Sequence, residues 1–280
     1  MADGSYRWQG NAPAPDAAQV DAIHDALQDE QADAFAEPAR LAAVQTIERA
    51  LSAARTGDLT EAHARLTHAR SVLQTLRPEA LEPHRGLGGL FDSRGRRLKV
   101  FRAAYLRAAA SVDEVARDLT GWIEGAGRRS GALDTVWAEV RDAVVDLDTH
   151  LAAAARRLTG HVPFEGQPHP LESRRATLDA CRMAAVAALP LLRNAQNTDA
   201  RFADLLKPCA EGAAAWREDW KDALGLSGHR PRKVRPDRER LLRLRDDLLA
   251  RIDRALSGIT LAHDRRAEVE ARLAALRHPL

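Results

Sequence analysis

Apolar residues recur at alternating intervals of three and four along one long stretch of the chain. The positions that share this spacing are Leu178, Cys181, Ala185, Ala188, Leu192, Ala195, Phe202, Leu206, Cys209, Ala213, Trp216 and Trp220, with a single break at Asp199. A repeat that averages 3.5 residues keeps one stripe of a helix turned toward its partner helices. The spacing therefore predicts one long helix, from about Leu171 to Leu224, packed against other helices.

Two further stripes, Leu98 to Trp122 and Leu133 to Leu158, stand on either side of Gly125 and Gly127. Because glycine is a poor helix former, we expect the first of these helices to end before Gly125. Two helices of similar length joined by a short turn lie antiparallel. Another stripe predicts a last helix from Asp237 to about Arg277, whose outer faces alternate Arg with Asp and Glu.

The chain before these stripes divides at clusters of glycine and proline. Residues 1–15 predict a flexible tail. Residues 16–82 predict an N-terminal helical region, in which the segment from Pro38 to Arg77 forms an αα-hairpin around Gly57. A glycine-rich stretch then opens residues 83–280, which predict a long antiparallel helical bundle. The predicted fold is all-α: an elongated antiparallel helical bundle or coiled coil with an N-terminal helical hairpin.

Charge and hydropathy narrow the classes of partner and compartment. The 42 basic and 40 acidic residues are interspersed and leave a net charge of +2, so no strong field attracts nucleic acid and we expect no specific nucleic-acid partner. No run reaches the roughly 18 apolar residues typical of a membrane-spanning helix, and the first residues include no apolar signal segment. We expect a cytoplasmic protein without a transmembrane segment.

No pattern of residues predicts catalysis. The sequence has no phosphate-binding loop, no nucleophile elbow, no zinc-protease motif and no dinucleotide fingerprint. Cys181 and Cys209 share one helix stripe, on the order of 42 Å apart in a continuous helix, which predicts two buried free thiols and no disulfide. His161 and His169 lack a carboxylate or thiol at ligand spacing. We expect no enzyme, no cofactor and no metal.

A polar cluster lies near the middle of the long stripe. Arg193, Gln196 and Asn197 stand between Pro190 and Pro208, and each proline removes an amide donor and is expected to bend the helix. Arg193 and Asn197 are four residues apart and share a face. Two interpretations stay open. In the first, the cluster is an exposed polar strip or a polar layer that fixes the register of the helix. In the second, it forms a binding site, in which the Arg193 guanidinium contacts an oxygen-rich anion or a partner.

Three stretches then point to a family. They are Gly86-Leu-Gly-Gly-Leu-Phe91 with the helix after it, Leu189-Pro-Leu-Leu-Arg-Asn-Ala-Gln196, and Ala215-Trp216-Arg217. Together they resemble the toxic anion resistance family, the TelA and KlaA proteins associated with tellurite resistance. Two features depart from the family: its paired asparagines fall here near Thr198 and Asp199, and the proline expected before the tryptophan is replaced by Ala. The resemblance implies an all-helical cytoplasmic protein linked to resistance, with no catalytic residue to transfer.

The hypothesis that follows is a non-enzymatic helical protein that acts by binding an oxyanion or a protein partner. Its candidate binding residues are Arg193, Gln196, Asn197 and Trp216. The alternative is a helical scaffold or adaptor with no direct contact to an anion. In either case we expect a protein partner, or self-association through the helix faces.

Overall fold

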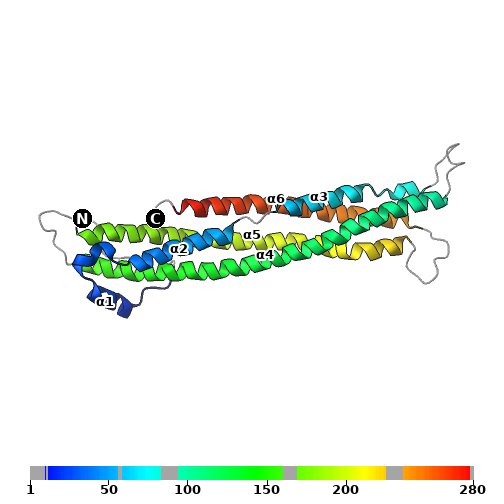
Figure 1. Ribbon diagram of the computed structural model, residues 1–280. Coiled ribbons are helices and arrows are strands. Elements are labelled where there is room, and N and C mark those ends of the chain that lie inside the picture. The colour runs from blue at the N-terminus through cyan, green and yellow to red at the C-terminus, as the bar shows by residue number, and fades with distance from the viewer. Residues whose placement is uncertain are drawn as a thin grey trace. The chain divides into compact units, whose positions relative to one another are not determined.

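The protein is all-α in the computed structural model, which describes residues 10, 12–55, 59–82, 94–159, 169–224 and 236–277 (Figure 1). The elements in chain order are α1 (Ala17–Ala26), the 3-10 helix η1 (Asp29–Ala34), α2 (Glu37–Ala54), α3 (Thr60–Gln74), the 3-10 helix η2 (Pro78–Leu81), α4 (Arg94–Thr159), α5 (Pro170–Ala223) and α6 (Arg238–Ala275). None of these helices combines the length and the apolar content needed to cross a bilayer. Most of the predicted tail, the Gly86–Phe91 stretch and His161 lie outside the described residues.

The chain forms two compact units. Unit 1 comprises Met1–Thr56, Arg129–Thr198 and Arg265–Leu280, and unit 2 comprises Gly57–Arg128 and Asp199–Asp264. Each of the three long helices therefore contributes one segment to each unit, whereas α2 belongs to unit 1 and α3 to unit 2.

Four of the helices in unit 1 form its main core. Its main hydrophobic cluster draws Ile47 and Ala50 from α2, Leu133, Val140 and Val144 from α4, Ala185, Ala188 and Leu192 from α5, and Val269 and Leu273 from α6. Ion pairs join Asp134 to Arg193 and Asp148 to Arg182. The residue numbers rise on α4 as they fall on α5, so these two helices are antiparallel. The apolar stripe of α5 thus packs against other helices as the sequence predicts. The two stripes predicted to pair with each other, residues 98–122 and 133–158, instead lie on the single helix α4.

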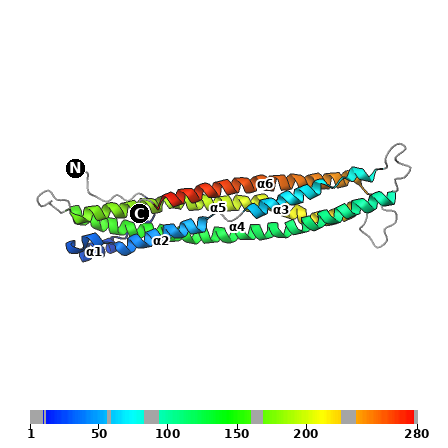
Figure 2. The same ribbon diagram turned by 45° about the horizontal axis from the view of Figure 1, so that its top comes forward.

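Unit 2 is a four-helix bundle, in which α3 takes part. Its cluster includes Leu66 and Leu73 of α3, Tyr105, Val112 and Leu119 of α4, Leu206, Trp216 and Trp220 of α5, and Leu248 and Ile252 of α6. α3 lies beside α6 (Figure 2). There Arg70 pairs with Asp253 at 2.6 Å and Arg245 donates to the Leu76 carbonyl at 2.9 Å.

The two helices of the predicted αα-hairpin, α2 and α3, contribute to different hydrophobic cores. The α2 stripe, with Ile47 at its centre, packs in the core of unit 1, and the α3 stripe, with Leu66, packs in the core of unit 2. Each stripe is therefore buried in a core to which α4, α5 and α6 also contribute.

The turn predicted around Gly125 and Gly127 is wrong, because α4 runs without interruption from Arg94 to Thr159. A glycine inside a helix costs only about 1 kcal/mol relative to alanine. One position of the heptad repeat stays apolar and buried across the glycines, at Leu119, Ala126, Leu133 and Val140. Burying a large aliphatic side chain contributes about 1.5–3 kcal/mol, which outweighs the weak helix propensity of the glycines.

The long helix α5 agrees with its predicted bounds and continues through both Pro190 and Pro208. At its N-terminus the ring nitrogen Nδ1 of His169 accepts a hydrogen bond from the Leu171 amide at 3.1 Å, so His169 caps the helix. Cys181 and Cys209 are both buried and free, as predicted. Burial raises the pKa of the Cys209 thiol to about 11, which keeps it protonated and unreactive at neutral pH.

A charged cluster at the start of α2 makes the stability of unit 1 depend on pH. Glu37 accepts hydrogen bonds from Arg40 at 2.7 and 3.0 Å and from Arg174 of α5 at 2.5 Å. These hydrogen bonds, first those from Arg40 and then that from Arg174, lower the pKa of Glu37 from 4.5 to about 2. A carboxyl group whose pKa is lower in the folded state stabilises the fold above its unfolded pKa.

We therefore expect the stabilising contribution of Glu37 to be complete above about pH 5 and to disappear as the pH falls from about 4.5 to 2. The measurement is the free energy of unfolding of the wild type and of Glu37→Gln between pH 7 and pH 2. The difference between the two proteins should shrink across that acidic range. A difference that stays constant down to pH 2 would show that the two arginines do not bind the carboxylate in solution.

Candidate functional site

The Arg193 side chain joins α5 to α4 within unit 1. Its Nη1 atom donates to Asp134 Oδ1 on α4 at 2.7 Å and to Gln196 Oε1 on its own helix at 2.7 Å. The guanidinium carbon lies 4.1 Å from the centre of the Trp137 ring, which is a cation–π contact. Gln196 in turn donates to the Ser130 carbonyl at 3.1 Å. Arg193 and Gln196, two of the predicted site residues, thus act together.

The Asp134 carboxylate neutralises the positive charge of Arg193. Hydrogen bonds from Arg193 and then from Gln196 lower the pKa of the Asp134 carboxyl, so Asp134 is ionised at neutral pH. A free oxyanion at this guanidinium would lie beside the Asp134 carboxylate and be repelled by it. The arrangement is suited to holding α4 and α5 together, with 46% of the Arg193 side chain still exposed.

The solvent-facing side of α5 in the same segment carries an uncharged stripe. Its members recur every three or four residues and are Ala180, Met183, Ala187, Pro190, Asn194 and Asn197, which we call the α5 stripe. Met183 is 61% exposed, and every other member except the half-buried Ala180 is also exposed. Arg193 is the exposed charge in this segment, and it lies at the edge of the stripe where it pairs with Asp134.

The stripe contrasts with the rest of the surface. Charged residues make up 29% of the sequence, and the exposed face of α6 carries Arg, Asp and Glu along its length. Pro190 has no amide proton, so the carbonyl of Val186, one turn earlier, lacks its normal helical donor. Beside the stripe, α5 therefore offers one backbone acceptor that its own helix does not use.

Trp216, the remaining predicted site residue, does not join this cluster, because it belongs to unit 2. Its ring is buried, with its centre 4.6 Å from that of Trp220 and 5.8 Å from that of Tyr105. Tyr105 donates its hydroxyl proton to the Arg217 carbonyl at 3.1 Å, which ties α4 to α5 beside these rings. Asn197, by contrast, is exposed and belongs to the α5 stripe.

Sequence reasoning missed the α4 side of the Arg193 cluster, namely Ser130, Asp134 and Trp137. Asp134 and Trp137 are three residues apart and so lie on adjacent turns of one helix face. This spacing was the one feature of the sequence that could have indicated that they act together. Within the described ranges, no three His, Cys, Asp or Glu side chains are placed to hold a metal ion together.

Comparison with known proteins identifies no relative of the chain: a scan of protein-family models, a search of curated proteins and a search of solved structures each returned no match.

Proposed function

We propose that this protein is a non-enzymatic helical adaptor that binds a protein partner through the α5 stripe. The observation that carries the proposal is the α5 stripe itself, a row of uncharged and mostly exposed side chains in a chain of which 29% of the residues are charged. Small residues such as Ala180 and Ala187 allow another helix to approach closely, and Met183 provides an adaptable apolar contact.

The partner's chemistry follows from the charge pattern. A charged side chain buried against the α5 stripe would lose its water without gaining a counter-ion, which costs several kcal/mol. The matching surface is therefore an uncharged helix face. Asn194 and Asn197 supply hydrogen-bond donors and acceptors toward it, and the Val186 carbonyl accepts a further hydrogen bond.

Partner binding agrees better with the geometry than capture of a free oxyanion does. The guanidinium of Arg193 already donates to Asp134 and lies against Trp137, so an anion would have to displace a bound carboxylate. In this proposal Arg193 and Gln196 hold α5 in place at the edge of the binding surface. The link to toxic anion resistance stays a prediction from sequence resemblance.

Site-specific photo-crosslinking in cells that produce the full chain tests the proposal. A photoreactive phenylalanine derivative at Met183 should give one discrete adduct. Adding the substitution Ala187→Glu should abolish this adduct, because a carboxylate would then be buried in the contact. Ala250→Glu on α6 is the matched control: it places the same charge at another exposed helical alanine and should leave the adduct intact.

The adduct's mass identifies the partner. An increment of 30.7 kDa, the mass of this chain, would identify a second copy, and any other increment would identify a different protein. If Met183 gives no discrete adduct, or Ala187→Glu and Ala250→Glu have equal effects, the stripe does not bind a partner.

A further inference from the structure

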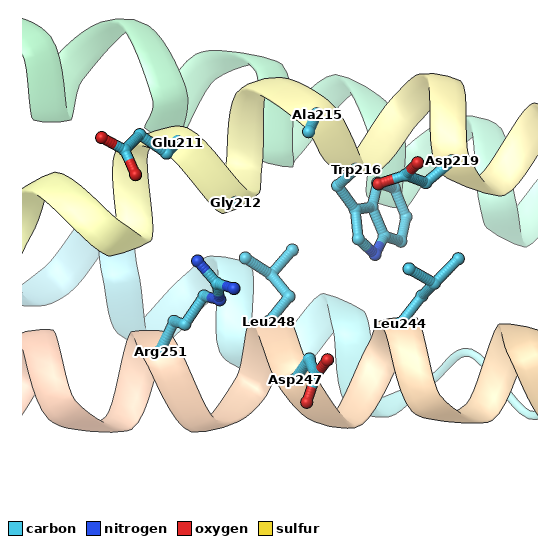
Figure 3. Close-up of a pocket in the computed structure, with 9 residues that line it drawn as sticks. All are labelled: Glu211, Gly212, Ala215, Trp216, Asp219, Leu244, Asp247, Leu248 and Arg251. Carbon is cyan, nitrogen blue, oxygen red and sulfur yellow. The ribbon is translucent and has the colours of Figure 1, made fainter.

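A cavity of about 210 Å³ lies between α5 and α6 in unit 2 (Figure 3). Its inner wall is apolar and comes from Ala215, Leu244 and Leu248 together with the ring of Trp216. Ligand sites for drug-sized molecules typically occupy about 300–1,000 Å³. This cavity therefore suits a smaller molecule or a single long side chain.

The indole of Trp216 leaves a hydrogen-bond donor unused at this cavity. The residue is only 2% exposed, and its Nε1 atom is buried with no hydrogen-bond partner among the described residues. Figure 3 shows this nitrogen turned toward α6, between Leu244 and Leu248. A buried indole N–H normally has an acceptor, because burying a donor without one leaves its lost hydration uncompensated. The cavity is thus the place from which an acceptor can reach it.

Carboxylates dominate the charged groups of the cavity lining. Glu211 and Asp219 of α5 and Asp247 of α6 all line it, and none of the three forms an ion pair or side-chain hydrogen bond with another described residue. The single cation is Arg251, which donates to the Pro208 carbonyl at 2.8 Å. Three negative groups against one positive group favour a cation and disfavour an oxyanion.

We propose that this cavity binds a small organic ammonium ion that also carries a hydrogen-bond-accepting oxygen. The oxygen accepts from Trp216 Nε1, the ammonium group lies toward Asp219 and Asp247, and the carbon chain between them packs on Leu244 and Leu248. The source is either a free amine or a lysine side chain with its neighbouring backbone carbonyl. This site lies in unit 2 and does not depend on the α5 stripe.

Nitrogen–proton NMR of the full chain tests the proposal through the indole signals of the five tryptophans. The probe is lysinamide, which carries two amines and an amide oxygen. We expect it to shift one indole signal saturably, and Trp216→Phe should remove that signal. Asp219→Asn and Asp247→Asn should each weaken binding about two- to fivefold, since partly exposed ion pairs contribute up to about 1 kcal/mol.

Three controls keep the test specific. Glu218→Gln, next to Asp219 on α5 but outside the cavity lining, should leave the affinity unchanged. Trp220→Phe should also retain binding, because Trp220 does not line the cavity. Diacetylated lysinamide, which has no positive charge, and sulfate should give no saturable shift. Circular dichroism of each variant verifies that the helices are intact.

The source is resolved by a second probe, a Gly/Ser peptide with blocked termini whose only charge is one central lysine. Binding of the peptide as tight as that of lysinamide assigns the site to a partner's lysine, whereas binding of lysinamide alone assigns it to a free amine. The proposal is overturned if neither probe shifts the Trp216 signal at 10 mM, if the uncharged analogue or sulfate binds equally well, or if both Asp variants retain full affinity.

Discussion

Asp148→Ala should lower the free energy of unfolding by about 3–5 kcal/mol, a large loss for a single substitution. Removing one member of a buried ion pair leaves the other charge in a low-dielectric interior without its counter-ion. Arg182 of α5 is the partner that would lose this ion pair. This loss is a large part of the roughly 5–15 kcal/mol that stabilises a typical domain.

The geometry of the pair explains the size of the expected effect. Arg182 of α5 donates from Nε to the Asp148 carboxylate of α4 within unit 1. The two side chains are 2% and 0% exposed. Along their own helices they adjoin members of a hydrophobic cluster, namely Leu147, Leu151, Leu178 and Cys181. Water therefore cannot replace a missing partner.

A double substitution separates the loss of the pair from the loss of its charge. Asp148→Leu combined with Arg182→Met replaces both ions by apolar groups, and such replacements are often neutral or stabilising by about 1–4 kcal/mol. We expect the double variant to recover most of the stability lost in Asp148→Ala. Urea unfolding monitored by circular dichroism measures all three proteins.

An exposed pair of the same type serves as the control. Arg217 and Asp113 join α5 to α4 in unit 2 at 2.7 Å, with side chains 49% and 37% exposed. Asp113→Ala should cost no more than about 1 kcal/mol, because water screens and replaces the partner. Equal losses at Asp113 and Asp148 would show that burial does not govern the effect.

The bounds of a helix were predictable where the residues at its two ends and its apolar stripe indicate the same start and end. The three-and-four spacing placed α5 within a residue or two, because a proline precedes its stripe and a glycine follows it. The α4 glycines gave the opposite result: Gly125 and Gly127 indicated a turn, although a buried heptad position continues through Ala126. A glycine lowers the stability of a helix by only about 1 kcal/mol per residue. The free energy gained by burying the apolar stripe in the core is larger.

The candidate site was predictable only within one helix. Arg193 and Gln196 are three residues apart, so their hydrogen bond follows from helix geometry. Asp134 and Trp137 contact Arg193 from α4, and that pairing depends on the axial register of two helices. A shift of one heptad would leave similar apolar stripes in contact and bring other residues opposite Arg193. Trp216 shares the buried stripe of α5, which makes it a core residue of unit 2.

Alanine at three glycines of α4 should stabilise the protein. Gly121, Gly127 and Gly131 lie inside the helix, and a Cβ atom added at each would meet nothing within 4 Å. Each substitution should raise the free energy of unfolding by about 0.8–1.0 kcal/mol, because alanine gains helix propensity without a clash. The triple variant should gain about 2–3 kcal/mol, measured by urea unfolding.

Gly212→Ala in α5 provides the contrast that makes this result specific. A Cβ atom there would lie 2.9 Å from Cδ of Arg251, a side chain of α6 that packs against α5 at this glycine. The same arginine donates to the Pro208 carbonyl. The gain in helix propensity is then offset by displacement of the arginine, so Gly212→Ala should be less stable than any of the three α4 variants. A turn at residues 125–131 would give the opposite result for Gly127→Ala: a glycine at a helix end favours the left-handed conformation, and alanine would destabilise it.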